Sequence, residues 1–167
     1  MKLPELPPTA SVEATVDATP EQVWAVISDV TRIGEWSHEC REAKWVGGAT
    51  HAVPGARFRG RNRVGLVRWG RICTITEVDP PLRFTYHTFG KLTRDSTQWT
   101  IELQPEGSGT RIVMGYEALA MPRAFELVIL ATMKPHWDRT AALQGDLQRL
   151  GRVAAGAGQE TAGPASG

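Results

Sequence analysis

Hydrophobic and polar residues alternate at the start of the globular part of the chain, over residues 11–17. A period of two is typical of a strand that buries one face. The pattern changes at Thr19-Pro20-Glu21-Gln22, which offers an N-cap, a proline at the first helical position and an acidic first turn. Apolar residues follow at helical spacing, so the sequence predicts a short helix here and a second short helix or turn over residues 29–35.

Alternation then returns and continues to about residue 119, interrupted by turns rich in glycine and proline. The predicted strands cover residues 41–46, 57–64, 68–78, 82–89 and 97–103, and a last strand carries Ile112, Met114 and Tyr116 on one face. Because short turns join successive strands, the sequence predicts an antiparallel meander.

Beyond Met121 apolar residues recur about every 3.6 positions, which predicts a long amphipathic C-terminal helix with Arg139 on its polar face. Pro135 is expected to kink this helix or to break it into two pieces. An antiparallel sheet must bury one face, and only this helix has enough apolar length to cover it. We therefore expect an α+β helix-grip fold, in which a curved antiparallel sheet of about six to seven strands wraps around the C-terminal helix. A sheet curved in this way commonly leaves an unfilled interior where small ligands bind.

Composition divides the chain into one domain and two ends. Residues 10–153 carry the globular pattern and are enough for a single domain. Residues 1–9 contain several prolines and are expected to be flexible. Residues 154–167 are rich in alanine and glycine and are expected to form a disordered tail.

The charge balance argues against several functions. The chain has 19 Lys and Arg against 18 Asp and Glu, whereas nucleic-acid-binding domains usually carry a strong basic excess. The same balance argues against a membrane-surface protein, and no stretch has the roughly 20 apolar residues that span a bilayer. The start of the chain has no signal-peptide pattern. We expect a cytoplasmic protein that binds no nucleic acid and does not insert stably in a membrane, as a monomer or a homodimer.

Three segments resemble a known family: ATPEQVWAVISDVTRIGEWS at residues 18–37, ITEVDPPLRFTYHT at 75–88 and EGSGTRIVMGYE at 106–117. With the amphipathic C-terminal segment, they are similar to the polyketide cyclase/dehydrase and lipid-transport group of the START-like (SRPBCC) superfamily over about residues 10–153. Members include ligand carriers, plant hormone receptors and aromatase/cyclases, so the resemblance implies the fold but no single activity. It implies binding of a lipid-like or aromatic, polyketide-like molecule in an internal cavity, with a cofactor-independent polyketide cyclase or dehydratase as the alternative.

Side chains on the inner faces of the predicted elements are the candidates for ligand binding. Asn62 shares the face of Phe58, which alternation places inside. A polar amide there needs a partner, which is either a ligand oxygen or neighbouring backbone or water. Tyrosine and tryptophan combine an apolar body with one polar group, and methionine adapts to irregular walls. The predicted ligand-binding residues are Trp36, Phe58, Asn62, Tyr86, Trp99, Met114, Tyr116, Phe125, Met133 and Trp137.

His38 is the candidate for acid–base chemistry, because it lies where the short helices lead into the sheet, near the expected rim of the cavity. The alternative is a solvent-exposed loop histidine. No pair among the four histidines has metal-ligand spacing, so we expect no metal, and we expect no cofactor. Cys40 and Cys73 lack CxxC spacing and are expected to be free thiols. No pair of carboxylates is predicted in the interior.

Arginine and tryptophan are unusually distributed. A row of arginines occupies one strand face and is expected in solvent: Arg57, Arg59, Arg61 and Arg63, continued by Arg68 and Arg71. Binding of an acidic partner through this face is a third hypothesis. Among the six tryptophans, Trp36, Trp99 and Trp137 are expected to converge on the cavity, whereas the pattern does not place Trp69.

Overall fold

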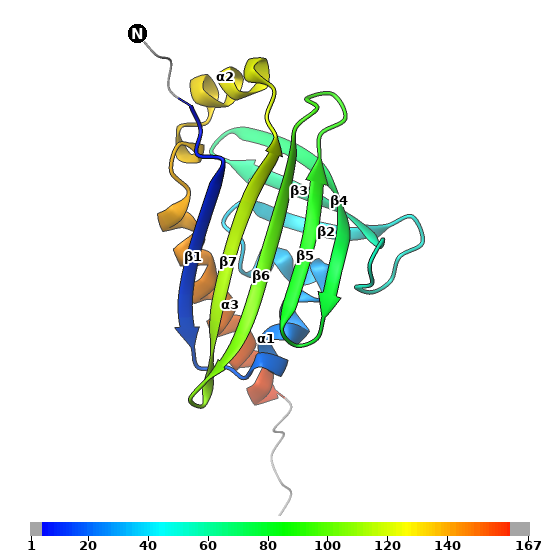
Figure 1. Ribbon diagram of the computed structural model, residues 1–167. Helices are drawn as coiled ribbons and strands as arrows, with labels where there is room; N and C mark the ends of the chain where they lie inside the picture. The colour runs from blue at the N-terminus through cyan, green and yellow to red at the C-terminus, as the bar shows by residue number, and fades with distance from the viewer. Residues whose placement is uncertain (1–4, 161–167) are drawn as a thin grey trace, which may run out of the picture.

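A seven-stranded antiparallel sheet curves around a C-terminal helix in the computed structural model, which describes residues 5–160 (Figure 1). The strands are β1 (Thr9–Val16), β2 (Cys40–Val46), β3 (Arg57–Val64), β4 (Val67–Asp79), β5 (Arg83–Phe89), β6 (Ser96–Glu106) and β7 (Gly109–Ala120). The helices are α1 (Pro20–Ile27), the 3₁₀ helix η1 (Val30–Glu35), α2 (Arg123–Thr132), the 3₁₀ helix η2 (Lys134–His136) and α3 (Thr140–Glu160). The predicted α+β helix-grip fold is confirmed.

The strands run in the spatial order β1-β7-β6-β5-β4-β3-β2. Strands β2 to β7 form the predicted meander, and β1 pairs with β7 in a register that places Val12 opposite Met114. β1 and β2 are therefore the two edges of an open sheet. Because successive strands are antiparallel, the β3–β4 turn, the β5–β6 loop and the start of α2 lie at one end of the sheet, and the β4–β5 and β6–β7 turns lie at the other (Figure 1).

The two short helices after β1 form where the sequence supplies caps and close contacts. Thr19 and Gln22 make a capping box, in which the backbone N–H of each residue donates to the side-chain oxygen of the other. Pro20 occupies the first helical turn. Gly34 lets η1 approach β2, because a Cβ at this position would lie 2.3 Å from the carbonyl oxygen of Arg41. This contact fixes the segment that leads into β2.

Helix α3 packs against the concave face of the sheet through one apolar stripe. Leu143, Leu147 and Leu150 are spaced by three or four residues and are almost fully buried. Gly151 lies against β1, where a Cβ would approach Val16 Cγ1 to 2.5 Å. This packing fills the end of the interior next to the β6–β7 turn.

The C-terminal segment is split rather than kinked. α2 ends at Thr132, Pro135 lies within η2, and α3 begins only at Thr140, so of the two outcomes expected at Pro135, a kink or a break, the structure has the break. Proline has no backbone N–H and disfavours helical backbone at the preceding residue. The break lets α2 cross the open end of the sheet while α3 runs along its concave face (Figure 1).

The structure describes part of each predicted end of the domain. α3 continues to Glu160, seven residues beyond the expected end of the domain, and the alanines of this segment favour helix. The Leu6 N–H donates to Glu126 Oε1 at 2.7 Å, which ties the chain before β1 to α2. Residues 1–4 and 161–167 lie outside the described residues. No helix within residues 5–160 is long and apolar enough to cross a membrane.

Candidate functional site

Two adjoining cavities lie between the sheet and the C-terminal helices. The inner cavity has a volume of about 80 Å³ and lies between the strands and the first part of α3. The outer cavity, of about 290 Å³, lies under α2 and η2, at the end of the sheet that carries the β5–β6 loop. The two cavities share six wall residues, which we call the waist: Glu39, Asn62, Arg71, Thr88, Trp99 and Arg139.

Eight of the ten predicted ligand-binding residues lie on the walls of these cavities. Trp36, Phe58, Tyr86 and Met114 line the inner cavity, Phe125 and Met133 line the outer one, and Asn62 and Trp99 line both. Strand alternation identifies most of them, because every second side chain of a strand faces the same side of the sheet. That they bind a ligand is still a prediction.

The two other predicted residues, Tyr116 and Trp137, are not among the wall residues of either cavity. Trp137 is 45% exposed and donates its Nε1–H to the carbonyl oxygen of Leu130 at 3.1 Å. Trp137 follows the break at Pro135 and lines neither cavity, so the structure does not show the expected convergence of this tryptophan on the cavity.

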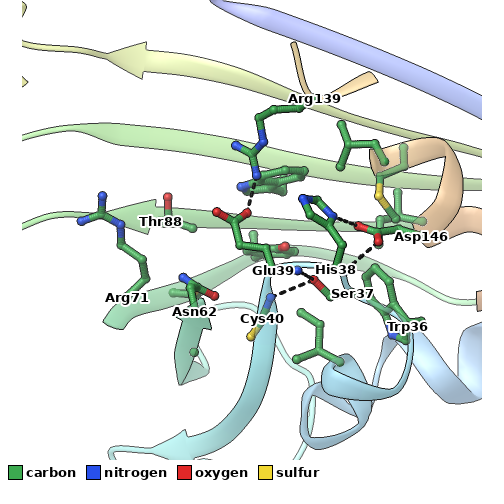
Figure 2. A pocket seen from close by; sticks show the side chains of 18 of the residues that line it. Trp36, Ser37, His38, Glu39, Cys40, Asn62, Arg71, Thr88, Arg139 and Asp146 are labelled. Atoms are coloured by element: carbon green, nitrogen blue, oxygen red, sulfur yellow. Dashed lines mark hydrogen bonds and ion pairs between the residues drawn. The ribbon is translucent and has the colours of Figure 1, made fainter. Parts of the chain in front are cut away.

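The turn between η1 and β2 presents two ionisable side chains to the interior, His38 and Glu39 (Figure 2). Ser37 shapes this turn, because its Oγ accepts the backbone N–H groups of Glu39 at 3.2 Å and Cys40 at 3.0 Å. His38 is held from α3: the carboxylate of Asp146 accepts its backbone N–H and also contacts its ring Nδ1, each at 2.7 Å. His38 is therefore not the solvated loop histidine of the alternative interpretation.

Asp146 is 2% exposed and also pairs with Arg149, whose Nε–H donates to the carbonyl oxygen of Trp36 at 2.9 Å. A carboxylate at Nδ1 orients an imidazole ring and keeps that nitrogen protonated, which leaves Nε2 of the neutral ring as a proton acceptor. The His38–Asp146 pair thus has the composition of an acid–base site on the wall of the inner cavity.

Glu39 connects the sheet to the C-terminal segment. Its carboxylate pairs with Arg139 and lies 2.9 Å from Nε2 of His136, and all three side chains are largely buried. Burial by itself raises the pKa of Glu39, but the contacts with His136 and Arg139 outweigh it and hold the pKa below its usual value of 4.5. Glu39 is therefore ionised at neutral pH although it lies inside the protein.

An aromatic row crosses the concave face of the sheet beside the waist. Ring centroids lie 5.4 Å apart for Phe58 and Tyr86, 6.4 Å for Tyr86 and Trp99, and 5.1 Å for Trp99 and Tyr116. The central guanidinium carbon of Arg139 lies 5.0 Å from the Trp99 centroid and 5.1 Å from that of Tyr116. Burial raises the pKa of Tyr86 well above its usual value of 10, so its hydroxyl stays protonated and can donate a hydrogen bond.

Arg71 does not continue the exposed arginine row. Its side chain turns inward, where Nη2 lies 3.0 Å from Oδ2 of the buried Asp95 and the guanidinium carbon lies 5.7 Å from the ring centroid of Phe125. Trp69, which the pattern left unplaced, shares this inward face and lines the outer cavity. The remaining arginines of the row are exposed, as expected: Arg57, Arg59, Arg61, Arg63 and Arg68.

Sequence reasoning missed the charged residues of the interior. It predicted no pair of carboxylates there, yet Glu39 and Asp146 both line the inner cavity. The spacing of Asp146 indicates that its side chain faces the interior, since it lies three residues after Leu143 and four before Leu150, on the apolar stripe of α3. Glu39 and Arg139 lie in connecting segments, where no periodicity indicates the direction of a side chain. Arg139, expected on an outer polar face, points inward.

Cys40 and Cys73 are free and buried on the wall of the inner cavity. Burial raises the pKa of Cys40 to about 11, and it raises the pKa of Cys73 as well. Because the thiolate is the reactive form, we expect neither cysteine of the folded protein to react with iodoacetamide at mildly alkaline pH, and both to react in urea. Mass spectrometry after timed labelling measures this, and rapid labelling of Cys40 in the folded protein would contradict it.

Within residues 5–160 no three His, Cys, Asp or Glu side chains are grouped so as to hold a metal ion.

Solved structures share this architecture at low sequence identity. Protein CV1439 from Chromobacterium violaceum is 18% identical and superposes with a TM-score of 0.63 over 89% of this chain and 98% of its own. TTHA0849 from Thermus thermophilus is 18% identical, with a TM-score of 0.70 over 90% of this chain and 99% of its own. DynU16, a protein of the dynemicin biosynthetic locus, is 15% identical, with a TM-score of 0.57 over 87% of this chain and 46% of its own. At these identities the likeness shows the fold alone.

Curated proteins provide no match to the chain. A family model does match, and its description is polyketide cyclase / dehydrase and lipid transport. The match covers residues 7–155, which include all seven strands and the wall residues of both cavities. The sequence motifs, the helix-grip fold and this match agree, and the chain belongs to the polyketide cyclase / dehydrase and lipid transport family.

Proposed function

We propose that the protein binds a hydrophobic small molecule in the two cavities, and that the molecule is aromatic and polyketide-like rather than a plain lipid chain. Apolar and aromatic side chains line both cavities, so burial of apolar ligand surface would favour binding by about 25 cal/mol per Å². The observation that carries the proposal is the waist, where polar groups border unfilled space between two apolar regions.

Asn62 and Tyr86 would orient the ligand. The Asn62 amide lines both cavities and can both donate to and accept from a ligand oxygen. The protonated hydroxyl of Tyr86 can donate to a ketone or phenol oxygen. Oxygenated ring systems carry such oxygens along their length, whereas a fatty acid carries them at one end. A polar waist between apolar regions therefore favours the first class of ligand, and the DynU16 locus is compatible with it.

Asn62→Leu is expected to change ligand selectivity more than stability. Leucine keeps most of the volume and removes the amide, so affinity for a hydroxylated polycyclic quinone should fall about tenfold, as for one lost hydrogen bond. Affinity for a fluorescent fatty acid should be retained or increase. Titrations with both probes, with urea unfolding of the variant as a stability check, measure the effect. An equal loss for the two probes would contradict the role given to Asn62.

A second candidate function is a cofactor-independent polyketide cyclase or dehydratase, and the His38–Asp146 pair favours it. Nε2 of His38 would take a proton from a carbon between two carbonyl groups, and the protonated ring would return it to a leaving hydroxyl group. Tyr86 would donate a hydrogen bond to the enolate oxygen that forms.

If the protein is an enzyme, His38→Ala should lower turnover of a poly-β-ketone substrate by at least about a hundredfold, the usual contribution of a general base. Affinity for the substrate should change much less than turnover, because every other wall residue of the two cavities stays in place. His51→Ala is the matched control, since His51 is an exposed histidine in the β2–β3 loop. Unchanged turnover in His38→Ala would exclude this mechanism, and a wild-type protein inactive on a panel of such substrates would leave binding as the function.

A further inference from the structure

Three segments surround the outer cavity at one end of the sheet, and we call them the rim. They are the β3–β4 turn with the adjoining ends of the two strands (residues 63–68), the β5–β6 loop (residues 90–95) and α2 with its flanking residues (121–134) (Figure 1). Val67 and Val128 line the outer cavity and are also exposed to solvent. The cavity therefore reaches the surface of the protein within the rim.

The rim carries apolar side chains that the fold does not bury. Leu66 in the β3–β4 turn is 94% exposed and Leu92 in the β5–β6 loop is 96% exposed, more than any other large apolar side chain among the described residues. Leu127 and Val128 add exposed apolar surface on α2. Apolar groups held in water at the tips of turns contribute nothing to the core and favour a contact outside the chain.

The charges of the rim indicate what that contact is. The rim contains six Lys and Arg but only two Asp and Glu, although the whole chain is nearly neutral. Both acids are buried and paired, Asp95 with Arg71 and Glu126 with Arg123. The exposed basic residues of the rim are Arg63, Arg68, Lys91, Arg94, Arg123 and Lys134. The overall balance, which argued against a membrane-surface protein, conceals this segregation.

We propose that the rim docks on an anionic membrane surface. Basic side chains attract anionic headgroups, and leucines at loop tips enter the interfacial layer; peripheral binding of useful strength needs both contributions. The apolar tips stand on separate segments around an opening and form no single groove, which suits a deformable planar layer better than a folded partner. Docking faces the opening of the outer cavity toward the bilayer, so a hydrophobic ligand passes between them without crossing water. That passage rests on the proposed function, whereas the docking does not.

Co-sedimentation with lipid vesicles tests the proposal. The wild-type protein is expected to bind vesicles of mixed phosphatidylcholine and phosphatidylglycerol, to bind pure phosphatidylcholine much more weakly, and to be released by added salt. Leu92→Asp should lower partitioning into the mixed vesicles at least about tenfold. The double variant Arg68→Glu/Lys91→Glu should do the same. All three side chains are exposed, so the fold should persist, and circular dichroism checks that it does.

Matched controls separate a rim effect from a general change of charge or polarity. Leu82→Asp makes the same substitution at an exposed leucine in the β4–β5 turn, at the opposite end of the sheet. Arg57→Glu/Arg59→Glu reverses two exposed arginines on the outer face of β3. Both controls should bind vesicles like the wild type. Equal losses in the controls, or no preference of the wild type for anionic vesicles, would overturn the proposal. If the wild-type protein does not bind vesicles but forms a dimer that Leu92→Asp dissociates, the rim binds a second copy of this chain and the membrane proposal is wrong.

Discussion

Replacing Glu39 with leucine is expected to lower the free energy of unfolding by about 3–5 kcal/mol, the usual cost of breaking a buried ion pair from one side. Glu39 is the counter-ion of Arg139 and lies against His136 in the interior. Its loss leaves a largely buried guanidinium group without a carboxylate and releases the linker before α3 from the sheet. Urea unfolding followed by tryptophan fluorescence measures the change.

Two further variants test this explanation. Glu42→Leu is the matched control, because the Glu42 carboxylate pairs with Lys44 and Arg61 at the surface, where an ion pair contributes little. The double variant Glu39→Leu/Arg139→Leu should be more stable than Glu39→Leu alone, because it removes the unpaired charge as well. A Glu39→Leu protein as stable as the wild type would mean that the pair does not hold the C-terminal segment.

The Glu39 carboxylate also makes the free energy of unfolding depend on pH. The pKa of Glu39 is lower in the folded protein than its usual value of 4.5, so the unfolded chain takes up the proton first as the pH falls. Its contribution is fully present above pH 4.5 and is lost as the pH falls through the lower, folded pKa. The stability difference between the wild type and Glu39→Leu should therefore be constant near neutrality and shrink in acid. A difference that grows in acid would contradict the sign of the shift.

Thr88→Trp is expected to abolish ligand binding. Thr88 lies on β5 and lines both cavities, so a tryptophan side chain there fills the waist and separates the inner cavity from the outer one. We expect affinity for a hydroxylated polycyclic quinone to fall at least about a hundredfold, because the ligand loses its polar contacts at the waist together with its apolar burial in one of the two cavities. Fluorescence titration measures the loss.

Thr74→Trp is the control for this substitution. Thr74 is half-buried on the neighbouring strand β4, next to Cys73, and alternation places it on the outer face because Cys73 lines the inner cavity. Its variant should bind like the wild type. If Thr88→Trp and Thr74→Trp bind the probe equally well, the ligand lies outside the waist and the proposed binding mode is wrong.

The sequence predicts the sheet because its strands alternate cleanly. The bounds expected for residues 57–64 are those of β3, and the inward positions of Phe58 and Asn62 follow from the same alternation. The C-terminal segment is less readable, because Pro135 is compatible with a kink or a split, and only packing decides between them. For that reason the sequence does not show on which side of the C-terminal segment Trp137 lies.

The chemistry of the site depends on contacts that no local pattern encodes. His38 and Asp146 are 108 residues apart, and Glu39 and Arg139 are 100 residues apart. Each pair joins the turn before β2 to the C-terminal segment, and periodicity says nothing about which distant side chain completes a charge pair. Asp146 on an apolar stripe was the one local sign that a buried charge needed a partner.

A hydrophobic small molecule in the two cavities should be found by native mass spectrometry of the protein purified from its own host, compared with Thr88→Trp prepared in the same way. We expect a small molecule that stays with the wild-type protein, is released on unfolding and is missing from Thr88→Trp. A wild-type protein that carries no small molecule, or one retained equally by both proteins, would contradict it.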